Sequence, residues 1–179
     1  MRFGPVPVPE AEGAILAHTH RGPSGTIRKG TRLAAADLAR LSSDGVETVV
    51  AAVLGKGDVH EDEAAARIAA AAAGEGIAVQ PPFTGRSNLF AERAGVLLVE
   101  RAGVDALNRI DPSVTIATLE AFRRVEADRM VATVKIIPFA VAGEVMAAAR
   151  DSLAASGPLM RLAQRAVERV AAMSTLLPS

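Results

Sequence analysis

The clearest periodic pattern of apolar and polar residues predicts a helix followed by a strand. Leu33, Leu38 and Leu41 recur at the spacing of one helix face. Asp44-Gly45 marks the end of this helix, because glycine adopts the left-handed backbone of a helix C-terminus without steric cost. Residues 46–54 are rich in β-branched side chains, which is typical of a strand buried on both faces.

The same reading extends over the rest of the chain. Further strands are predicted at residues 1–9, 14–20, 77–80, 88–93, 96–100, 114–119 and 130–137, and helices at 61–73, 104–108 and 143–156. The strands at 88–93 and 96–100 are expected to pair around Ala94-Gly95. Short strands that alternate with alanine-rich helices indicate an α/β fold of the mixed α+β type.

We expect a two-part arrangement. Residues 1–80 would form a strand-helix-strand-helix part, and residues 81–157 a second part built on a mixed sheet. Residues 158–179 are then a linker and a further segment whose periodicity allows a helix.

Several runs of residues resemble one known family. They are GAILAHTH, IRKGTRLAAADLARLSSDGVETVVAA, GDVHEDEAAARIAAAAAG, FTGRSNLFAERAGVLLVE, LNRIDPSVTIATL and MVATVKIIPFAV. Over most of residues 1–155 the chain is similar to the MoeA-like molybdopterin-binding proteins of molybdenum-cofactor biosynthesis. In that family a "kGt-L-x-x-x-D-x-x-x-L-x-x-x-G-v-x-x-V" run follows a "G-x-x-L-A-h" strand.

This resemblance implies a function for the chain. It would be the non-catalytic N-terminal module of a molybdopterin-binding protein, and it would position a downstream cofactor-binding domain and form one wall of a cofactor cleft. The implied cofactor is molybdopterin, an anionic pterin dithiolene phosphate. Residues 167–175 resemble the first strand of that downstream domain, so the chain is expected to be a fragment. Self-association into a homo-oligomer is a further expectation.

Composition excludes several other function classes. The 20 basic and 20 acidic residues balance, so no global field attracts nucleic acid or an anionic membrane surface. The absence of cysteine excludes disulfides, thiolate catalysis and cysteine-ligated metals. No apolar run has the length of a signal peptide or a membrane span. We therefore expect a cytoplasmic protein without nucleic-acid or membrane partners.

The best candidate for anion binding is the loop that contains Gly85, Arg86, Ser87 and Asn88. Glycine lets backbone N–H groups turn toward a phosphate, arginine offers a two-pronged donor, and the serine and asparagine side chains add further donors. The loop lacks the spacing of a phosphate-loop motif, and ordinary turn chemistry accounts for the same residues.

Lys135 is the second candidate, and it completes the predicted cofactor-binding set. It is one of three lysines in the chain and lies in the apolar run MVATVKIIPF. Two interpretations remain open for it. It faces a ligand cleft as a phosphate contact, or it extends into water from the solvent side of a half-buried sheet.

The histidines are weaker candidates, and we predict no metal ligand and no catalytic residue. Asp58 and His60 precede the predicted helix and Glu61 begins it, and a capping box explains these acidic residues better than a metal site does. His18 and His20 lie two apart on a predicted strand and share a face, as an exposed pair, a metal pair or partners of a carboxylate.

No sequence motif indicates a nucleophilic triad, a dinucleotide site or a nucleotidyltransferase loop. Two functions from other classes remain as alternatives. One is a self-association domain that uses the alanine-rich helices, and the other is a small enzyme that acts on a phosphorylated small molecule. The enzyme alternative requires Arg86, Asn88 and Lys135 to converge near an acid or base such as His60.

Overall fold

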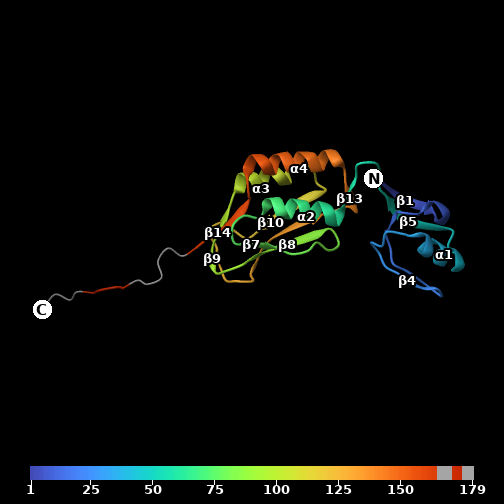
Figure 1. Ribbon diagram of the computed structural model, residues 1–179, viewed down its shortest axis with the longest axis horizontal. Helices are drawn as coiled ribbons and strands as arrows, with labels where there is room; N and C mark the ends of the chain where they lie inside the picture. Colours follow the sequence, from blue (N-terminus) through green and yellow to red (C-terminus); the bar gives the residue numbers. More distant parts are fainter. Residues whose placement is uncertain (165–170, 175–179) are drawn as a thin grey trace.

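The computed structural model describes residues 1–164 and 171–174 (Figure 1). This part of the chain contains four α-helices, and its strands pair antiparallel. The predicted mixed α+β class is therefore confirmed. None of the described helices is long and apolar enough to cross a membrane.

Buried apolar side chains form two separate clusters. One cluster draws its residues from Val6 to Ala51, and the other from Ala64 to Leu162. We call residues 1–55 the first module and residues 59–163 the second module. Figure 1 shows them next to each other, with the first module at the blue end of the chain.

The first module is built on a three-stranded sheet in the order β1-β5-β2. Its elements are β1 (Arg2–Pro7), the 3-10 helix η1 (Val8–Glu10), β2 (Ile15–Leu16), β3 (His20–Gly22), β4 (Gly25–Ile27), α1 (Ala35–Ser43) and β5 (Thr48–Val53). The central position of β5 explains why the neighbouring Ala51 and Ala52 are both fully buried. Helix α1 buries Leu41, and Gly45 follows it with φ of 76°, as the sequence predicts for a helix end.

The second module contains a four-stranded sheet in the order β10-β12-β8-β7 and a three-stranded sheet in the order β11-β9-β14. Its strands are β6 (Val59–His60), β7 (Ile77–Val79), β8 (Arg86–Ala91), β9 (Gly95–Val99), β10 (Val114–Thr118), β11 (Arg124–Val125), β12 (Met130–Ile136), β13 (Ala140–Val141) and β14 (Met160–Ala163). Its helices are α2 (Glu61–Ala72), α3 (Arg101–Asn108) and α4 (Gly143–Ser156).

All three of these helices lie on one side of the four-stranded sheet (Figure 1). Helix α2 packs on β8 and β12, α3 packs on β10, and α4 lies against α2 and α3. The sheet therefore buries one set of side chains, such as Leu89 and Val134, under the helices. The alternate set on its other side is exposed or half-buried, and we call that side the open face.

The two cores divide between Val53 and Val59, earlier than the expected boundary at residue 80. Helix α2 precedes that expected boundary, yet its buried Ile68 belongs to the core of the second module. The reason is that an alanine-rich helix can approach a sheet closely, and the sheet that accepts it is formed by later residues.

Two further expectations differ from the structure. Strands β8 and β9 do not pair with each other, because β8 pairs with β7 and β12 while β9 pairs with β11 and β14. Residues from 158 onward were expected to be a linker, but Met160–Ala163 forms β14 with Met160 and Leu162 buried. The expected strand at 167–175 lies largely outside the described residues, and Ala171–Ser174 have no regular secondary structure.

Candidate functional site

The loop predicted to bind an anion is a tight hairpin turn. Phe83 and Arg86 exchange two backbone hydrogen bonds of 2.8 and 3.0 Å, and the two residues between them, Thr84 and Gly85, have φ of 45° and 70°. Positive φ at both central residues is the pattern of a two-residue hairpin connection that matches the twist of the strands. Gly85 is therefore required by the turn itself.

Two of the expected anion donors already have partners inside the protein. The Gly85 N–H donates to Asp62 Oδ1 at 2.7 Å, which ties the turn to the start of α2. Ser87 is fully buried, and its hydroxyl donates to the Gln80 carbonyl at 2.9 Å. These two groups stabilise the hairpin, and neither is directed toward a ligand.

The other predicted residues lie together on the open face. Arg86 and Asn88 alternate with buried residues along β8, and Lys135 lies directly opposite Arg86 on β12. Asn88 Oδ1 accepts a hydrogen bond from the Thr133 hydroxyl at 2.8 Å. The structure thus brings Arg86, Asn88 and Lys135 onto one surface, as neighbours on two adjacent strands.

Arg86 and Lys135 form a cationic pair without a compensating acid. In the described part of the chain, neither side chain makes an ion pair with a carboxylate. Like charges at directly opposite strand positions repel each other, so this arrangement lowers the stability of the sheet. It also leaves a local positive potential that attracts an anion.

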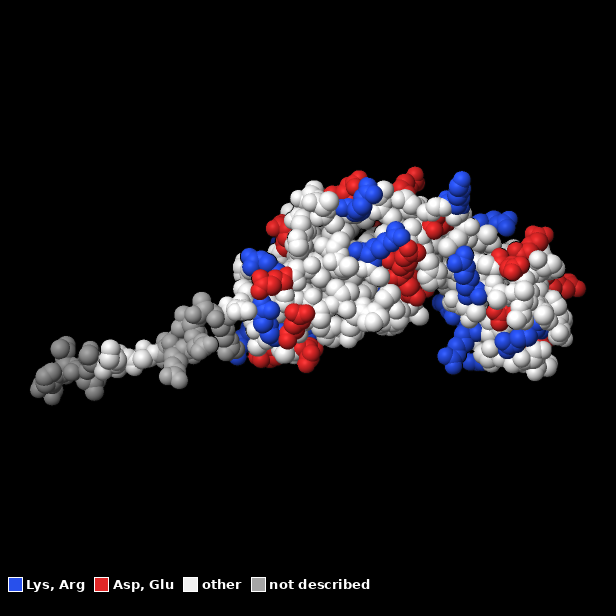
Figure 2. All heavy atoms as spheres, in the orientation of Figure 1, with Lys and Arg blue, Asp and Glu red and all other residues white. Residues whose placement is uncertain are grey.

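Lys135 also lines a cleft of about 530 Å³ between the two modules, which we call the inter-module cleft. Its walls are Met1, Phe3, Lys29, Gly30, Glu61, Thr84, Lys135, Ile136, Ile137, Pro138 and Phe139. The space-filling view shows the outline of the molecule indented between the two modules (Figure 2). A cavity of this volume is typical of a site for a small molecule.

Aromatic and charged side chains meet in this cleft. The rings of Phe3 and Phe139 stack with a centroid separation of 6.3 Å, and Lys29 Nζ lies 5.8 Å from the centroid of Phe139. Glu61 is partly buried at the start of α2, and this burial, together with the nearby Asp62, raises the pKa of its carboxyl group. The sequence gives no signal for the contact of Lys29 with Phe139, which lies 110 residues later.

The acidic residues near His60 serve the backbone, but with a different geometry from the predicted capping box. Asp58 accepts from the Gly55 N–H at 2.6 Å, three residues before it, because Val59 and His60 form a strand. The residue that caps α2 is His60, whose Nδ1 accepts from the Asp62 N–H at 3.2 Å. No group of three metal-ligating side chains occurs among the described residues.

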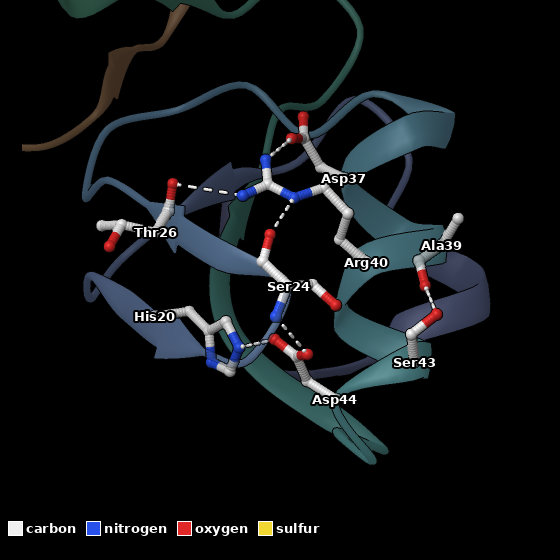
Figure 3. A network of polar contacts seen from close by, with 8 residues as sticks. All are labelled: His20, Ser24, Thr26, Asp37, Ala39, Arg40, Ser43 and Asp44. Atoms are coloured by element: carbon white, nitrogen blue, oxygen red, sulfur yellow. Dashed lines mark hydrogen bonds and ion pairs between the residues drawn. The ribbon is translucent and has the colours of Figure 1, made fainter.

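His20 forms part of a polar network that joins the β3–β4 hairpin to α1 (Figure 3). Its Nε2 lies 2.8 Å from Asp44 Oδ2, and the Ser24 N–H donates to Asp44 Oδ1 at 2.9 Å. Arg40 Nε donates to the Ser24 carbonyl at 3.2 Å. His20 is thus the partner of a carboxylate, while His18 is exposed.

A second hollow lies between two helices of the second module. It has a volume of about 460 Å³ and is lined by Val59, Arg67, Ile68, Ala71, Gly143, Met146, Ala147, Arg150 and Leu153. Its floor is apolar, and the two arginines each contact an acid on their own helix, Glu63 and Asp151. This groove offers a surface for packing and no catalytic group.

A family model described as a domain of unknown function (DUF8806) matches residues 5–53. The match starts in β1 and ends on the last residue of β5, so it covers the sheet and core of the first module. No curated protein and no solved structure matches the chain.

Proposed function

We propose that the chain is the non-catalytic N-terminal module of a cytoplasmic molybdopterin-binding protein in molybdenum-cofactor biosynthesis. It positions a downstream cofactor-binding domain, and its inter-module cleft forms one wall of the site for the anionic cofactor. The observation that carries this proposal is the uncompensated pair Arg86 and Lys135, whose second member lines that cleft. The resemblance over residues 1–155 supplies the identity of the ligand.

The chemistry of the site supports binding rather than catalysis. Two ammonium groups, one carboxylate and an aromatic surface face the cleft, and these groups suit the recognition of an anionic ring compound. Thr84 carries the one hydroxyl among the described residues that line it, and no hydrogen bond joins that hydroxyl to a base. Molybdopterin, with its phosphate and its pterin ring, has the features that such a cleft recognises.

The test is a calorimetric titration with purified molybdopterin. It compares this chain with the same chain joined to the downstream cofactor-binding domain. Binding by this chain, weakened in Lys135→Ala, supports a cofactor wall. Binding only by the longer protein supports the positioning role without direct contact. Absence of binding by both overturns the proposal.

Self-association is a second candidate, favoured by the apolar groove between α2 and α4. A second copy that places the same helices across the groove would cover its apolar floor and exclude water from Met146. Sedimentation equilibrium tests it directly. A dimer that dissociates in Met146→Glu supports this candidate, and a monomer at every concentration overturns it.

A further inference from the structure

The inter-module cleft gathers residue types that are scarce in this chain. The sequence has three lysines, five phenylalanines and no tyrosine or tryptophan. Two of the lysines, Lys29 and Lys135, and two of the phenylalanines, Phe3 and Phe139, line this one cleft. The N-terminal part of the chain and a part more than 100 residues later thus each provide one ammonium group and one aromatic ring.

The two modules contribute these groups from opposite walls. Lys29 and Phe3 belong to the first module, and Lys135 and Phe139 belong to the second. The Phe3 side chain remains 56% exposed although its ring stacks on Phe139. Phe3 therefore presents an exposed aromatic surface beside the cleft, and Lys29 lies over the ring of Phe139.

We infer that the cleft holds a phosphate monoester of a planar ring, with the phosphate between Lys29 and Lys135 and the ring against Phe3 and Phe139. This inference rests on the proposed function, and it identifies which groups of the ligand the cleft recognises. Two ammonium groups match the two negative charges of a phosphate monoester, since charge-assisted hydrogen bonds are the strongest that side chains provide. The flat aromatic surface matches a ring by stacking.

The carboxyl group of Glu61 affects how tightly the cleft binds a phosphate. It is the carboxylate among the lining residues, and its burial disfavours the ionised form. A carboxylate beside the phosphate would repel it, so removal of this charge strengthens phosphate binding. The groups that face Glu61 are His60 and Asp62 on its own segment and Lys29 from the first module.

The experiment compares three probes by calorimetry and pterin fluorescence: a pterin monophosphate, the same pterin without phosphate, and inorganic phosphate. We expect the monophosphate to bind about ten-fold more tightly than either other probe. Lys29→Met and Lys135→Met should each weaken the monophosphate about ten-fold and leave the unphosphorylated pterin unchanged. Phe139→Leu should weaken both pterins, and Glu61→Gln should strengthen monophosphate binding.

Lys56→Met is the matched control, because Lys56 is the third lysine and does not line the cleft. If Lys56→Met weakened monophosphate binding as much as Lys29→Met and Lys135→Met do, binding would depend on the overall positive charge of the protein. That result would overturn the inference. Equal affinity for the phosphorylated and unphosphorylated pterins would also overturn it. Circular dichroism melts of each variant separate loss of binding from loss of folding.

The outcomes separate this inference from the proposed function. One outcome is that the pterin monophosphate binds as described, but neither this chain nor the longer protein binds molybdopterin. The phosphate site between Lys29 and Lys135 is then supported, and the assignment to molybdenum-cofactor biosynthesis is wrong. The other outcome is that the longer protein binds molybdopterin, but the lysine variants bind the pterin monophosphate as tightly as the wild type does. The proposed function is then supported, and the phosphate site between Lys29 and Lys135 is wrong.

Discussion

Arg86 and Lys135 lie directly opposite each other on β8 and β12, on the face of the sheet that none of the described helices covers. Opposed like charges on adjacent strands destabilise a sheet by about 0.2–1 kcal/mol. A protein can retain such a pair where the positive charge serves binding. We therefore expect that replacing either residue with a neutral one raises the stability of the protein and lowers its affinity for an anion.

We expect Arg86→Thr and Lys135→Thr each to raise the free energy of unfolding by about 0.5 kcal/mol at low salt. In the double variant, the increase in the free energy of unfolding should be smaller than the sum of the two single increases, because either single change already removes the repulsion. Urea denaturation followed by circular dichroism measures these values.

Arg124→Thr is the control for this series, because Arg124 lies on β11, 3.6 Å from Glu126, and has an attractive partner. It should not stabilise the protein. Added salt should reduce the gain at Arg86 and Lys135, since the repulsion is between exposed charges. Additive effects that are independent of salt would contradict a repulsive pair.

The turn at Gly85 predicts a substitution that the fold does not tolerate. Gly85 has φ of 70°, and a Cβ there would lie 2.8 Å from Glu61 Oε2 and 2.9 Å from the Ile136 carbonyl oxygen. Gly85→Ala should therefore lower the free energy of unfolding by about 2 kcal/mol or more, from backbone strain and from the backbone contact.

Gly45→Ala is the matched control, because Gly45 ends α1 with the left-handed φ of 76° and has open space where the Cβ would lie. We expect it to cost about 1 kcal/mol, the strain alone. Equal losses in the two variants would show that the contact with Ile136 relaxes at no cost.

The elements that the sequence predicts best are those with a complete local pattern. Helix α4 occupies residues 143–156 as expected, and Gly157 ends it. In β12, residues 132–136 alternate between buried and less buried positions, the period-two pattern of a strand with one covered face. The alternation fails only at the start of β12, where a register shift between Met130 and Ala132 leaves Met130 exposed and Val131 buried. Such a bulge has no sequence signal of its own.

Strand pairing and the site depend on residues far apart in the sequence, and the sequence alone could not predict them. Strands β8 and β9 follow each other closely but pair with strands that come 40 or more residues later, namely β12 and β14. Lys135 was recognisable because a lysine in an apolar strand is unusual. Lys29 was not, because its neighbour Phe139 is brought to it only by the arrangement of the two modules.

Asp44 predicts a pH-dependent contribution to the stability of the first module. The hydrogen bonds from His20 and Ser24 hold the pKa of its carboxyl group below the ordinary value. Because the folded pKa is the lower one, the ionised carboxylate stabilises the fold above about pH 4, and this contribution is lost as the pH falls through the folded pKa.

The measurement is a carbon NMR titration of the Asp44 carboxyl group. His20→Ala should raise its titration midpoint toward the ordinary value, since the bond from His20 is the largest cause of the lowered pKa. His18→Ala is the control, because His18 is exposed and makes no hydrogen bond to Asp44 in the described chain. An unchanged midpoint in His20→Ala would mean that Ser24 alone lowers the pKa.

The division into two cores predicts where the native protein is cleaved first. An endoprotease that cuts after lysine has three sites, at Lys29, Lys56 and Lys135. Lys135 lies within β12, which is hydrogen-bonded to strands on both sides, and the Lys29 N–H donates to the Thr19 hydroxyl at 3.0 Å. Lys56 is exposed between the modules, in a segment outside both cores.

We therefore expect the first cut after Lys56, about ten-fold or more faster than the cuts after the other two lysines, because cleavage requires local unfolding and this segment buries least. Mass spectrometry of a time course identifies the fragments. Lys56→Arg should remove the early cut without altering the circular dichroism spectrum. A first cut after Lys29 would mean that the first module opens more readily than the connection, and that the match over residues 5–53 does not mark a stable unit.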